Sequence, residues 1–481
     1  MPPTNDPIIL RLIFRPLTGG ALLRWEADVL GVRESRLPNP LPPADLGLVL
    51  RALDALQDPA YPTAWTVQQQ ESFSFSADER ERLNKLGLWA GGRVAPDASE
   101  RVGRRLFRAL TLDQAGATAL ATIRDHVAAL GRTLGLELCF PPTAVELAAL
   151  PWELLWDAGP TPLLLSRGAS ATCVRRLDLP EALPPPRAPH GALRILAISP
   201  ASGISEELRH VERVAREVAW EPLLKGGMAE MTEVAPATLE ALVAAINPDM
   251  PPDIIHYYGH GRYRDGVGAL LLDAPCQGEA SPTMRSEPQG WVGGDASPLR
   301  TTGGVWTPVS ALAPLLSPAG MVILHACQGA MMGEHGDLHS AIAPALCAAG
   351  VPVVLGMQFT VRIAAASRMA AVIYQALAEG RSVGAALAFA RRALYVEEPE
   401  RVSWYVPALY VRSRTSGPIF LRPAAPPTPI PPTKRAAAAQ QAIIARNGGN
   451  INGLRMQGSP SSRQVVFAEG GTIQGVEMVG G

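Results

Sequence analysis

The pattern of hydrophobic and polar residues changes about 190 residues into the chain. From there to about residue 400, short and nearly all-apolar runs alternate with longer segments whose apolar residues recur at helical spacing. Such runs are typical of parallel strands buried on both faces, and the segments between them of amphipathic helices. The alternation therefore predicts an α/β fold, with a mostly parallel sheet covered by helices on both faces. The expected strands lie within residues 193–200, 253–261, 321–329 and 351–357.

The rest of the chain differs in composition from this core. The run ILRLIF near the N-terminus predicts a strand, and the Pro-rich segment 181–190 predicts a connector. The tract 422–434 is Pro-rich, as semi-rigid linkers are. We expect five parts: a small N-terminal region of unknown role at 1–100, the first part of the main domain at 101–185, its larger part at 190–421, a Pro/Ala-rich linker at 422–440 and a tail at 441–481.

The tail contains an internal repeat with an offset of 22 residues. GGNINGLRMQG (448–458) aligns with GGTIQGVEMVG (470–480), and Ile443 and Ile444 align with Val465 and Val466. Two copies are too few for a solenoid, which needs about three. Two alternatives remain: a flexible Gly-rich tail, or a pair of short strands that adds to another surface. We favour the second, which makes the tail a recruitment or regulatory segment.

Charge and hydropathy exclude several classes of protein. The chain has 481 residues, with 43 Lys and Arg against 44 Asp and Glu, so its formal charge of −1 predicts no direct binding to nucleic acid or to a membrane surface. The uncharged stretch 340–360 contains Pro344, Gly350 and Pro352, which predict a helix, a turn and a buried strand rather than a membrane span. The N-terminal segment has a short, interrupted apolar run, unlike a signal peptide.

The five cysteines are an odd number, widely spaced and without a CxxC pair. This pattern argues against a disulfide scaffold and against a structural zinc site, and we expect no cofactor and no metal. A reducing cytoplasm fits such a chain best. Cys139, Cys173 and Cys347 lie in apolar runs, where cysteine is typically a buried small hydrophobe. Cys276 lies in a long loop without a matching histidine motif.

Two motifs with histidine follow apolar strands. They are HYYGHG (256–261) and LHACQG (324–329). Because reactive groups in a parallel sheet collect at the carboxyl ends of the strands, both motifs should reach the same edge. A cysteine there becomes a nucleophile when a nearby base generates its thiolate. We therefore expect Cys327 to pair with His260, which is flanked by glycines, whereas His256 inside the strand is expected to pack.

Residues from about 100 to 420 resemble the CHAT domain, a bacterial caspase-like peptidase domain of clan CD. The resemblance rests on several blocks in the right order: LPWELLWDAG…TCVRRL (150–177), DIIHYYGHGRY, MVILHACQGA, and IAPALCAAGVPVVLGM with the final WYVPALYV. It implies a caspase-like α/β sandwich and a cysteine endopeptidase. It also implies a catalytic dyad of His260 and Cys327, and an oxyanion hole formed by the backbone N–H groups of Gly261 and Cys327.

One position departs from the family. CHAT cysteine blocks usually carry a small residue where this chain has His325, so a preference for basic P1 residues is not implied. His325 either packs or tunes Cys327 electrostatically. Asp265, Glu334 and Asp337 lie in loops after the two motifs. Together with His325 they are candidates for substrate contacts.

Three hypotheses for the function remain. We favour a peptidase that acts on a protein substrate and, as the resemblance implies, stays latent until a partner triggers it in a bacterial signalling or antiphage defence system. An activating or sensing partner protein could bind the tail 441–481. The alternatives are a CHAT-fold interaction module without turnover, and a metal-dependent hydrolase. The latter would use His256, His260, His325 and Cys327 as ligands, and it is disfavoured because no supporting carboxylate is evident.

Overall fold

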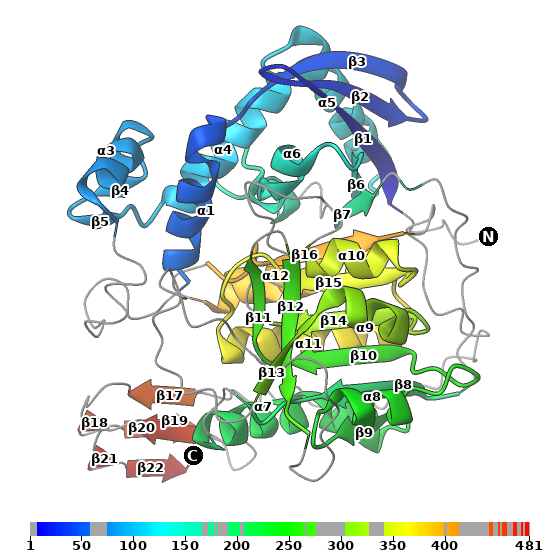
Figure 1. Ribbon diagram of the computed structural model, residues 1–481. Helices are drawn as coiled ribbons and strands as arrows, with labels where there is room; N and C mark the ends of the chain where they lie inside the picture. The colour runs from blue at the N-terminus through cyan, green and yellow to red at the C-terminus, as the bar shows by residue number, and fades with distance from the viewer. Residues whose placement is uncertain are drawn as a thin grey trace. The chain divides into compact units, whose positions relative to one another are not determined.

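The computed structural model describes most of the chain (Figure 1). It separates into a large unit, built from residues 1–59, 75–293 and 298–421, and a second unit that contains the tail. The predicted boundaries near residues 100 and 185 stay predictions. The described residues are 7–57, 75–165, 172–177, 179, 191–202, 206–264, 267–275, 304–326, 341–398 and 402–412, and in the tail 442–445, 451–452, 455–458, 465–468, 473–474 and 477–480.

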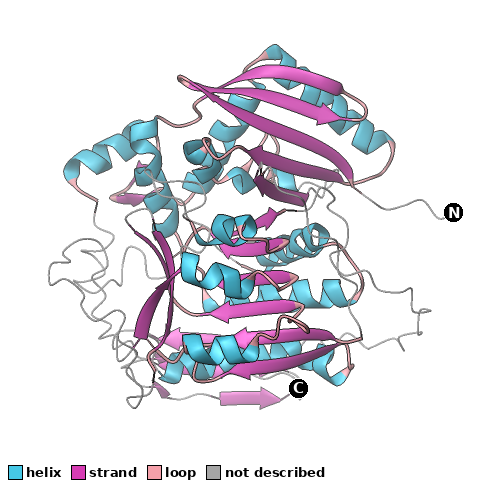
Figure 2. Cartoon of the chain, turned by 45° about the vertical axis from the view of Figure 1, so that its right-hand side comes forward, coloured by secondary structure: helices cyan, strands magenta, loops and turns pink. Residues whose placement is uncertain are grey.

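Eleven strands of the large unit form one sheet (Figure 1, Figure 2). In spatial order they are β3 (Gly31–Pro38), β2 (Gly20–Ala27), β1 (Ile8–Leu17), β6 (Leu134–Phe140), β7 (Thr172–Leu177), β16 (Pro407–Val411), β15 (Val353–Met357), β14 (Met321–His325), β10 (Ile254–Tyr258), β8 (Leu193–Ile198) and β9 (Ala229–Val234).

Parallel pairing prevails in this sheet. One parallel block runs from β1 through β6 and β7 to β16, and the other from β15 through β14, β10 and β8 to β9. The blocks meet in the antiparallel pair of β15 and β16, and β2 and β3 extend the edge beside β1 in antiparallel fashion. The N-terminal strands are therefore part of the same sheet as the two histidine motifs.

Helices cover both faces of the block that contains β10 and β14 (Figure 2). One face forms a common core with α8 (Leu239–Ala245), α9 (Val309–Leu316) and α10 (Ile342–Ala348). The other face contacts α7 (Glu206–Lys225) and α11 (Ile363–Ala378), and α12 (Val383–Glu397) packs on α11. The predicted α/β class, with helices on both faces of a mostly parallel sheet, is confirmed.

The central strands are apolar because both of their faces are covered. Every residue of β10, β14 and β15 is buried. Side chains alternate between the faces along each strand, so Tyr257 belongs to the core with α8 to α10, whereas His256 and Tyr258 contact the layer of α7 and α11. None of the helices that the structure describes is both long and apolar enough to cross a membrane.

The remaining elements of the large unit are shorter or lie beside the N-terminal strands. A three-stranded sheet orders β11, β12 and β13. These elements are α1 (Leu46–Ala55), α3 (Ala77–Lys85), β4 (Trp89–Ala90), β5 (Arg93–Val94), α4 (Ala98–Thr111), α5 (Gln114–Ala129), α6 (Val145–Ala149), β11 (Gly261–Arg264), β12 (Val267–Asp273) and β13 (Gly304–Pro308), with 3-10 turns at Pro43–Asp45, Trp152–Leu154 and Leu163–Leu165.

A buried ion pair supports the join between β7 and β16, where only Tyr410 and Arg175 are register partners. The guanidinium of Arg175 donates to both carboxylate oxygens of Glu153, at 2.9 and 2.6 Å, and to Oε1 of Gln358 at 2.8 Å. The amide nitrogen of Gln358 donates to Glu153 at 3.0 Å and to the carbonyl of Tyr405 at 3.2 Å. These side-chain hydrogen bonds therefore support the pairing of β7 with β16, which has a short backbone ladder.

In the tail, the two copies of the repeat pair with each other. Three parallel pairs form, β17 (Ala442–Ala445) with β20 (Val465–Ala468), β18 (Ile451–Asn452) with β21 (Ile473–Gln474), and β19 (Arg455–Gly458) with β22 (Glu477–Gly480). The aligned offset of 22 holds for the last two pairs. It is wrong for the first, where Ile443 pairs with Val466, because five residues separate β17 from β18 but only four separate β20 from β21.

Candidate active site

The described parts of the two histidine motifs lie side by side at one edge of the sheet. β10 and β14 are parallel neighbours, and their register pairs Tyr258 with His325, the last residue of each strand. Immediately beyond, the N–H of Gly259 donates to the carbonyl oxygen of His325 at 3.1 Å. The two segments therefore leave the sheet together, as the argument from the carboxyl ends of parallel strands predicts.

The turn that carries His260 is held by its backbone. The N–H of Leu271 on β12 donates to the carbonyl of His260 at 3.0 Å, and the hydroxyl of Tyr257 lies 2.9 Å from the same oxygen and 2.7 Å from the carbonyl of Leu271. A Cβ on Gly259 would lie only 2.5 Å from the Tyr257 hydroxyl oxygen, so this position needs glycine for close approach rather than for an unusual φ. His260 is a half-buried residue.

A buried cluster lies on the α7 and α11 side of the sheet beneath the motifs. His256 is fully buried; its Nδ1 is 2.7 Å from the hydroxyl of Tyr374 on α11, and its Nε2 is 3.0 Å from Nδ1 of His325. The ring of Tyr258 stacks on His256 with 3.9 Å between centroids, and its hydroxyl is 3.0 Å from Nδ1 of His256. Trp220 of α7 packs against this group, with its ring centroid 5.7 Å from that of His256.

Both imidazoles of the cluster are neutral near pH 7. Burial lowers the pKa of His256 well below its usual value, and the neighbouring His325 and the positive charge of Arg216 lower it further. Burial alone lowers the pKa of His325 to about 3. His256 is thus a packed, hydrogen-bonded residue, as its place inside the strand predicts. It is poorly suited to act as a general base, whereas His260 is only half-buried.

The predicted site residues fall into two groups. His260 and Gly261 lie at the turn between β10 and β11, and His325 lies in the buried cluster, 6% exposed. The remaining four lie outside the described residues: Asp265, Cys327, Glu334 and Asp337. Substrate contact by His325 therefore stays a prediction. Its Nε2 is buried and has no hydrogen-bond partner within the described part of the chain.

The metal hypothesis gains no support from the described residues. No group of three or more His, Cys, Asp or Glu side chains there could hold a metal ion. His256 and His325 instead bond to each other, and His256 also lies within hydrogen-bonding distance of two tyrosine hydroxyls. Both of its ring nitrogens are therefore engaged within the protein.

The small sheet of β11, β12 and β13 follows the histidine motif directly. Asp273, the last residue of β12, accepts hydrogen bonds from the N–H and hydroxyl of Ser202 and from the N–H of Ala237, at 2.8 to 2.9 Å. On the neighbouring strands, the guanidinium of Arg262 lies 4.3 Å from the ring centroid of Trp306. Sequence reasoning missed these residues. Only the final aspartate of the apolar run GALLLD hints at such an anchor.

Three cysteines lie within the described residues. Cys139, Cys173 and Cys347 are buried, as their apolar runs predict. Burial raises the pKa of Cys173 and of Cys347 to about 12, so neither thiol ionises near neutral pH. They are structural residues and useful controls for chemistry at Cys327.

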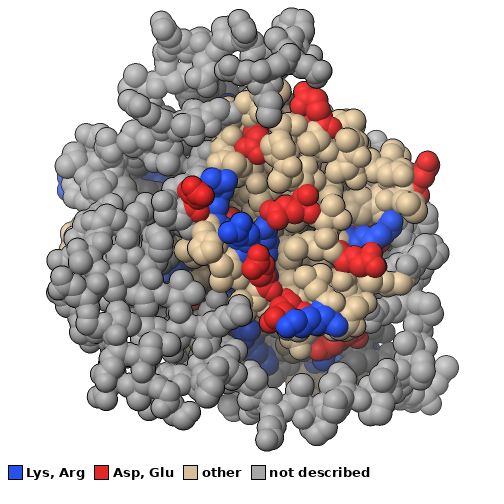
Figure 3. All heavy atoms as spheres, turned by 90° about the horizontal axis from the view of Figure 1, so that it is seen from below, with Lys and Arg blue, Asp and Glu red and all other residues tan. Residues whose placement is uncertain are grey.

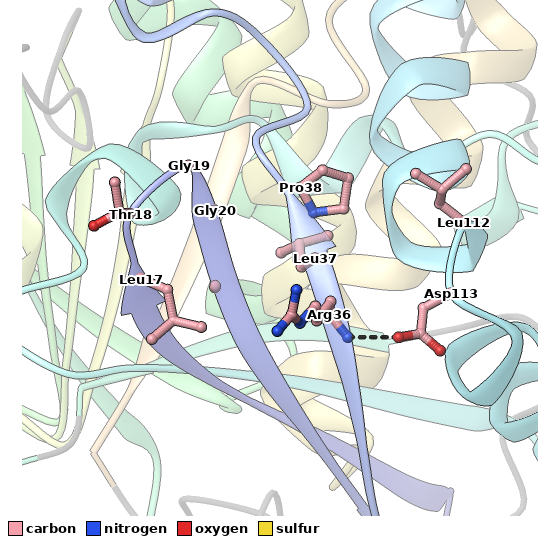
Figure 4. Close-up of a pocket in the computed structure, with 10 residues that line it drawn as sticks. Leu17, Thr18, Gly19, Gly20, Arg36, Leu37, Pro38, Leu112 and Asp113 are labelled. Atoms are coloured by element: carbon pink, nitrogen blue, oxygen red, sulfur yellow. Dashed lines mark hydrogen bonds between the residues drawn. The ribbon is translucent and has the colours of Figure 1, made fainter.

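A shallow hollow elsewhere on the large unit is a weak alternative site (Figure 4). It lies between the β1–β2 turn, the end of β3 and the junction of α4 and α5. Its one acidic group, Asp113, accepts hydrogen bonds from the N–H groups of Arg36 at 2.9 Å and Ala115 at 2.8 Å. These bonds lower the pKa of Asp113 and use the carboxylate to cap α5 and hold β3. The hollow therefore serves the protein's own structure.

One face of the molecule carries charged side chains of both signs. Figure 3 shows Lys and Arg beside Asp and Glu on its described part, with neither sign prevailing. Such a mixed face exerts no strong attraction on a polyanion.

Together, the parallel sheet and the paired motifs at its edge define an α/β protein with a histidine-bearing turn beside a cysteine block. The profile of the CHAT domain family matches residues 100–415. The chain therefore belongs to the CHAT domain family, and the resemblance seen in the sequence is confirmed. None of the curated protein sequences compared with the chain is significantly similar to it.

Similar solved structures include two of the Saccharomyces cerevisiae separase–securin complex. They are 12% identical, with TM-scores of 0.42 and 0.43, and the alignments cover 84% and 85% of this chain but 30% of each matched chain. The Arg-specific cysteine proteinase gingipain R (RgpB) is 11% identical, with a TM-score of 0.36, and 63% of this chain aligns with 68% of that one. This chain thus spans less than a third of the separase-complex chains it matches.

Proposed function

We propose that the protein is a cysteine endopeptidase that uses His260 and Cys327 as its catalytic dyad. The observation that carries the proposal is the register of β10 and β14. Gly259, bonded to His325, directly precedes His260, and Ala326, the last described residue of its segment, directly precedes Cys327. The proposed pairing rests on the positions of Gly259 and Ala326, each one residue before a member of the dyad.

The chemistry follows from the two side chains. His260 takes the proton of the Cys327 thiol, and the thiolate sulfur attacks the carbonyl carbon of the scissile peptide bond. The backbone N–H groups of Gly261 and Cys327 donate to the resulting oxyanion. The imidazolium of His260 then protonates the leaving amine as the C–N bond breaks. Water, deprotonated by His260, hydrolyses the remaining thioester and releases the new carboxylate.

The buried cluster supports this site in two ways. His325 is tied to His256, and His256 to Tyr374 on α11, so the end of β14 is held in place just before Cys327. Because His256 and His325 are neutral, they add no positive charge beside the thiolate–imidazolium pair of the dyad. The turn around His260 is held independently by Tyr257.

The biological setting is proposed from family membership. The substrate is a protein, and Asp265, His325, Glu334 and Asp337 are the candidates for contacts with it. The enzyme acts in the cytoplasm and is latent until a partner triggers it in a bacterial signalling or antiphage defence system. The tail 441–481 is the proposed segment for regulation.

The proposal is tested by cleavage of a peptide library, read by mass spectrometry, with the purified full-length chain and with cell extract added as a source of the trigger. Cys327→Ala and His260→Ala should each lower cleavage by several orders of magnitude, because loss of either member of such a pair removes most of the rate. Cys347→Ala and His126→Ala change a buried core cysteine and a histidine on α5, and they should retain activity. Cleavage that survives in Cys327→Ala would refute the proposal.

If His260→Ala keeps activity while His256→Ala abolishes it, the wrong histidine has been assigned. If no variant and no condition gives cleavage, including addition of cell extract as a source of the trigger, the protein is an interaction module with the CHAT fold.

A further inference from the structure

Within the described residues of the tail, each strand of the paired repeats has one edge without a paired strand. β17, β18 and β19 each pair with one strand of the second repeat, and each of these sheets has two strands among the described residues of the tail (Figure 1). A strand in a two-stranded sheet has one ladder of N–H and C=O groups paired and the other facing outward. The first repeat therefore offers three short edges on one side, and the second repeat three on the other.

The two repeats carry identical residues at three pairs of register positions. Ile451 pairs with Ile473, Met456 with Met478 and Gly458 with Gly480. Identical residues stacked in parallel register are typical of strand assemblies that grow by adding identical segments. Because the repeats are equivalent at these positions, the outer edge of the second repeat can pair with the first repeat of another chain as the first repeat pairs with the second within one chain.

We propose that the tail is a self-assembly segment, in which the second repeat of one molecule pairs with the first repeat of the next copy of this chain. The contact is head-to-tail and does not close, so copies add in an open stack. Repeat architectures need about three or more units for stability, and one tail supplies two. Stacking of copies supplies the missing units.

The charges of the tail favour pairing of a second repeat with a first repeat over pairing of two second repeats. Arg455 and Glu477 are register partners and are the only charged residues in the six described strands of the tail. In a head-to-tail stack every Arg455 position lies between two Glu477 positions, its own and that of the next copy. Pairing two second repeats would instead place Glu477 against Glu477. Opposite charges across a ladder stabilise it, and like charges destabilise it.

The described strands also lack two of the residues that most often protect an edge, lysine and proline. Natural edge strands carry lysine, proline or inward-pointing charges that block pairing with another chain. The six strands here contain no lysine and no proline, and β20 reads VVFA. Asn452 and Gln474 are register partners, and amide ladders of this kind add to stacked assemblies.

Assembly would concentrate the large units. The Pro-rich tract 422–434 spans at most about 40 Å at roughly 3.1 Å per residue. Short tethers of this kind produce effective concentrations in the millimolar range. The stack itself needs no peptidase activity, so the inference does not depend on the proposed function.

The test uses the full-length chain with Cys327→Ala, so that self-cleavage cannot remove the tail. Sedimentation velocity from about 1 to 100 μM should show growth of large species above a threshold concentration, and aligned stacks should diffract at about 4.7 Å, the spacing of neighbouring strands. Growth of the stacks should begin only after a delay, and preformed stacks added to fresh protein should remove this delay.

Charge variants in the same background test the head-to-tail register. Arg455→Glu and Glu477→Arg each create like-charge neighbours and should raise the threshold at least tenfold. The double exchange, Arg455→Glu with Glu477→Arg, restores alternation and should restore assembly. An equal thermal unfolding temperature of the large unit in all variants shows that folding is not the cause. A chain that stays monomeric at 100 μM overturns the proposal, and so does a double exchange that fails to restore assembly.

Discussion

The N–H of Gly259 donates a hydrogen bond to the carbonyl oxygen of His325 at 3.1 Å, directly beyond the last paired residues of β10 and β14. This bond links the histidine block to the cysteine block one residue before His260 and two residues before Cys327. Its geometry depends on the absence of a side chain at Gly259, beneath which the hydroxyl of Tyr257 passes. The contact between these two residues can be tested separately from the dyad.

Gly259→Ala should lower kcat/KM strongly, because its Cβ would approach the Tyr257 hydroxyl oxygen to 2.5 Å and displace the turn that carries His260. Tyr257→Phe should lower it about tenfold, since a lost buried hydrogen bond costs roughly 1–2 kcal/mol. The double variant removes the closest colliding atom, the hydroxyl oxygen, and leaves the ring Cζ 2.8 Å from the new Cβ. It should therefore lose less activity than the two single effects combined. Strictly additive losses would show that the two residues act independently.

The buried histidine pair predicts a pH-dependent stability. Unfolded histidines take up protons below about pH 6.5, whereas burial keeps His256 and His325 neutral in the native state. Below that pH the unfolded state binds more protons, so the free energy of unfolding should fall as the pH falls. For His325 the loss continues towards the native pKa of about 3. Each proton of difference contributes about 1.4 kcal/mol per pH unit.

Guanidinium unfolding at pH 7.5, 6.5 and 5.5 measures this effect. His325→Asn keeps an amide near His256 but removes one titrating group. The slope of its free energy of unfolding against pH should therefore be smaller than that of the parent, by at most about 1.4 kcal/mol per pH unit. His126→Asn, on helix α5, is the control and should keep the parent dependence. An identical slope in parent and His325→Asn would show that the buried pair does not carry the effect.

The carboxylate of Glu153 predicts a large stability effect far from the candidate site. Burial favours its neutral form, but the charge and hydrogen bonds of Arg175 outweigh burial and lower the pKa of Glu153. Glu153→Ala would leave the Arg175 guanidinium, 1% exposed, without its partner and should cost about 3–5 kcal/mol. Glu397→Ala breaks an exposed pair with Arg368 and should cost less than about 1 kcal/mol. Equal losses for the two variants in chemical unfolding would contradict this assignment.

Removal of residues 422–481 should separate catalysis from control. The large unit contains its own sheet and both histidine motifs, so truncation after Leu421 should preserve cleavage of a short peptide. The truncated chain should lose assembly and any regulation that depends on it. Loss of peptide cleavage with the thermal unfolding temperature unchanged would place the tail within the catalytic machinery.

Sequence patterns predicted much of this structure because apolar runs and the residues that directly follow them are local features of the sequence. All-apolar runs such as MVILH predicted buried parallel strands, and the positions of His260 and Cys327 after two such runs predicted a common edge. The role of Tyr257 could not be predicted, because its hydroxyl meets the carbonyl of Leu271, 14 residues away, across a turn. The Glu153–Arg175 pair joins segments whose proximity depends on the whole sheet order. In the tail, a one-residue difference between connections shifted the register at Ile443.

The pairing of His260 with Cys327 is tested most directly by the rate at which iodoacetamide alkylates Cys327 at pH 6, followed by peptide mapping. A thiolate stabilised by a neighbouring imidazolium reacts well below the usual thiol pKa of about 8.5. The parent chain should therefore be alkylated at Cys327 at least tenfold faster than His260→Ala, while the buried Cys173 and Cys347 stay unmodified. Equal rates at Cys327 in the parent and in His260→Ala would contradict the dyad.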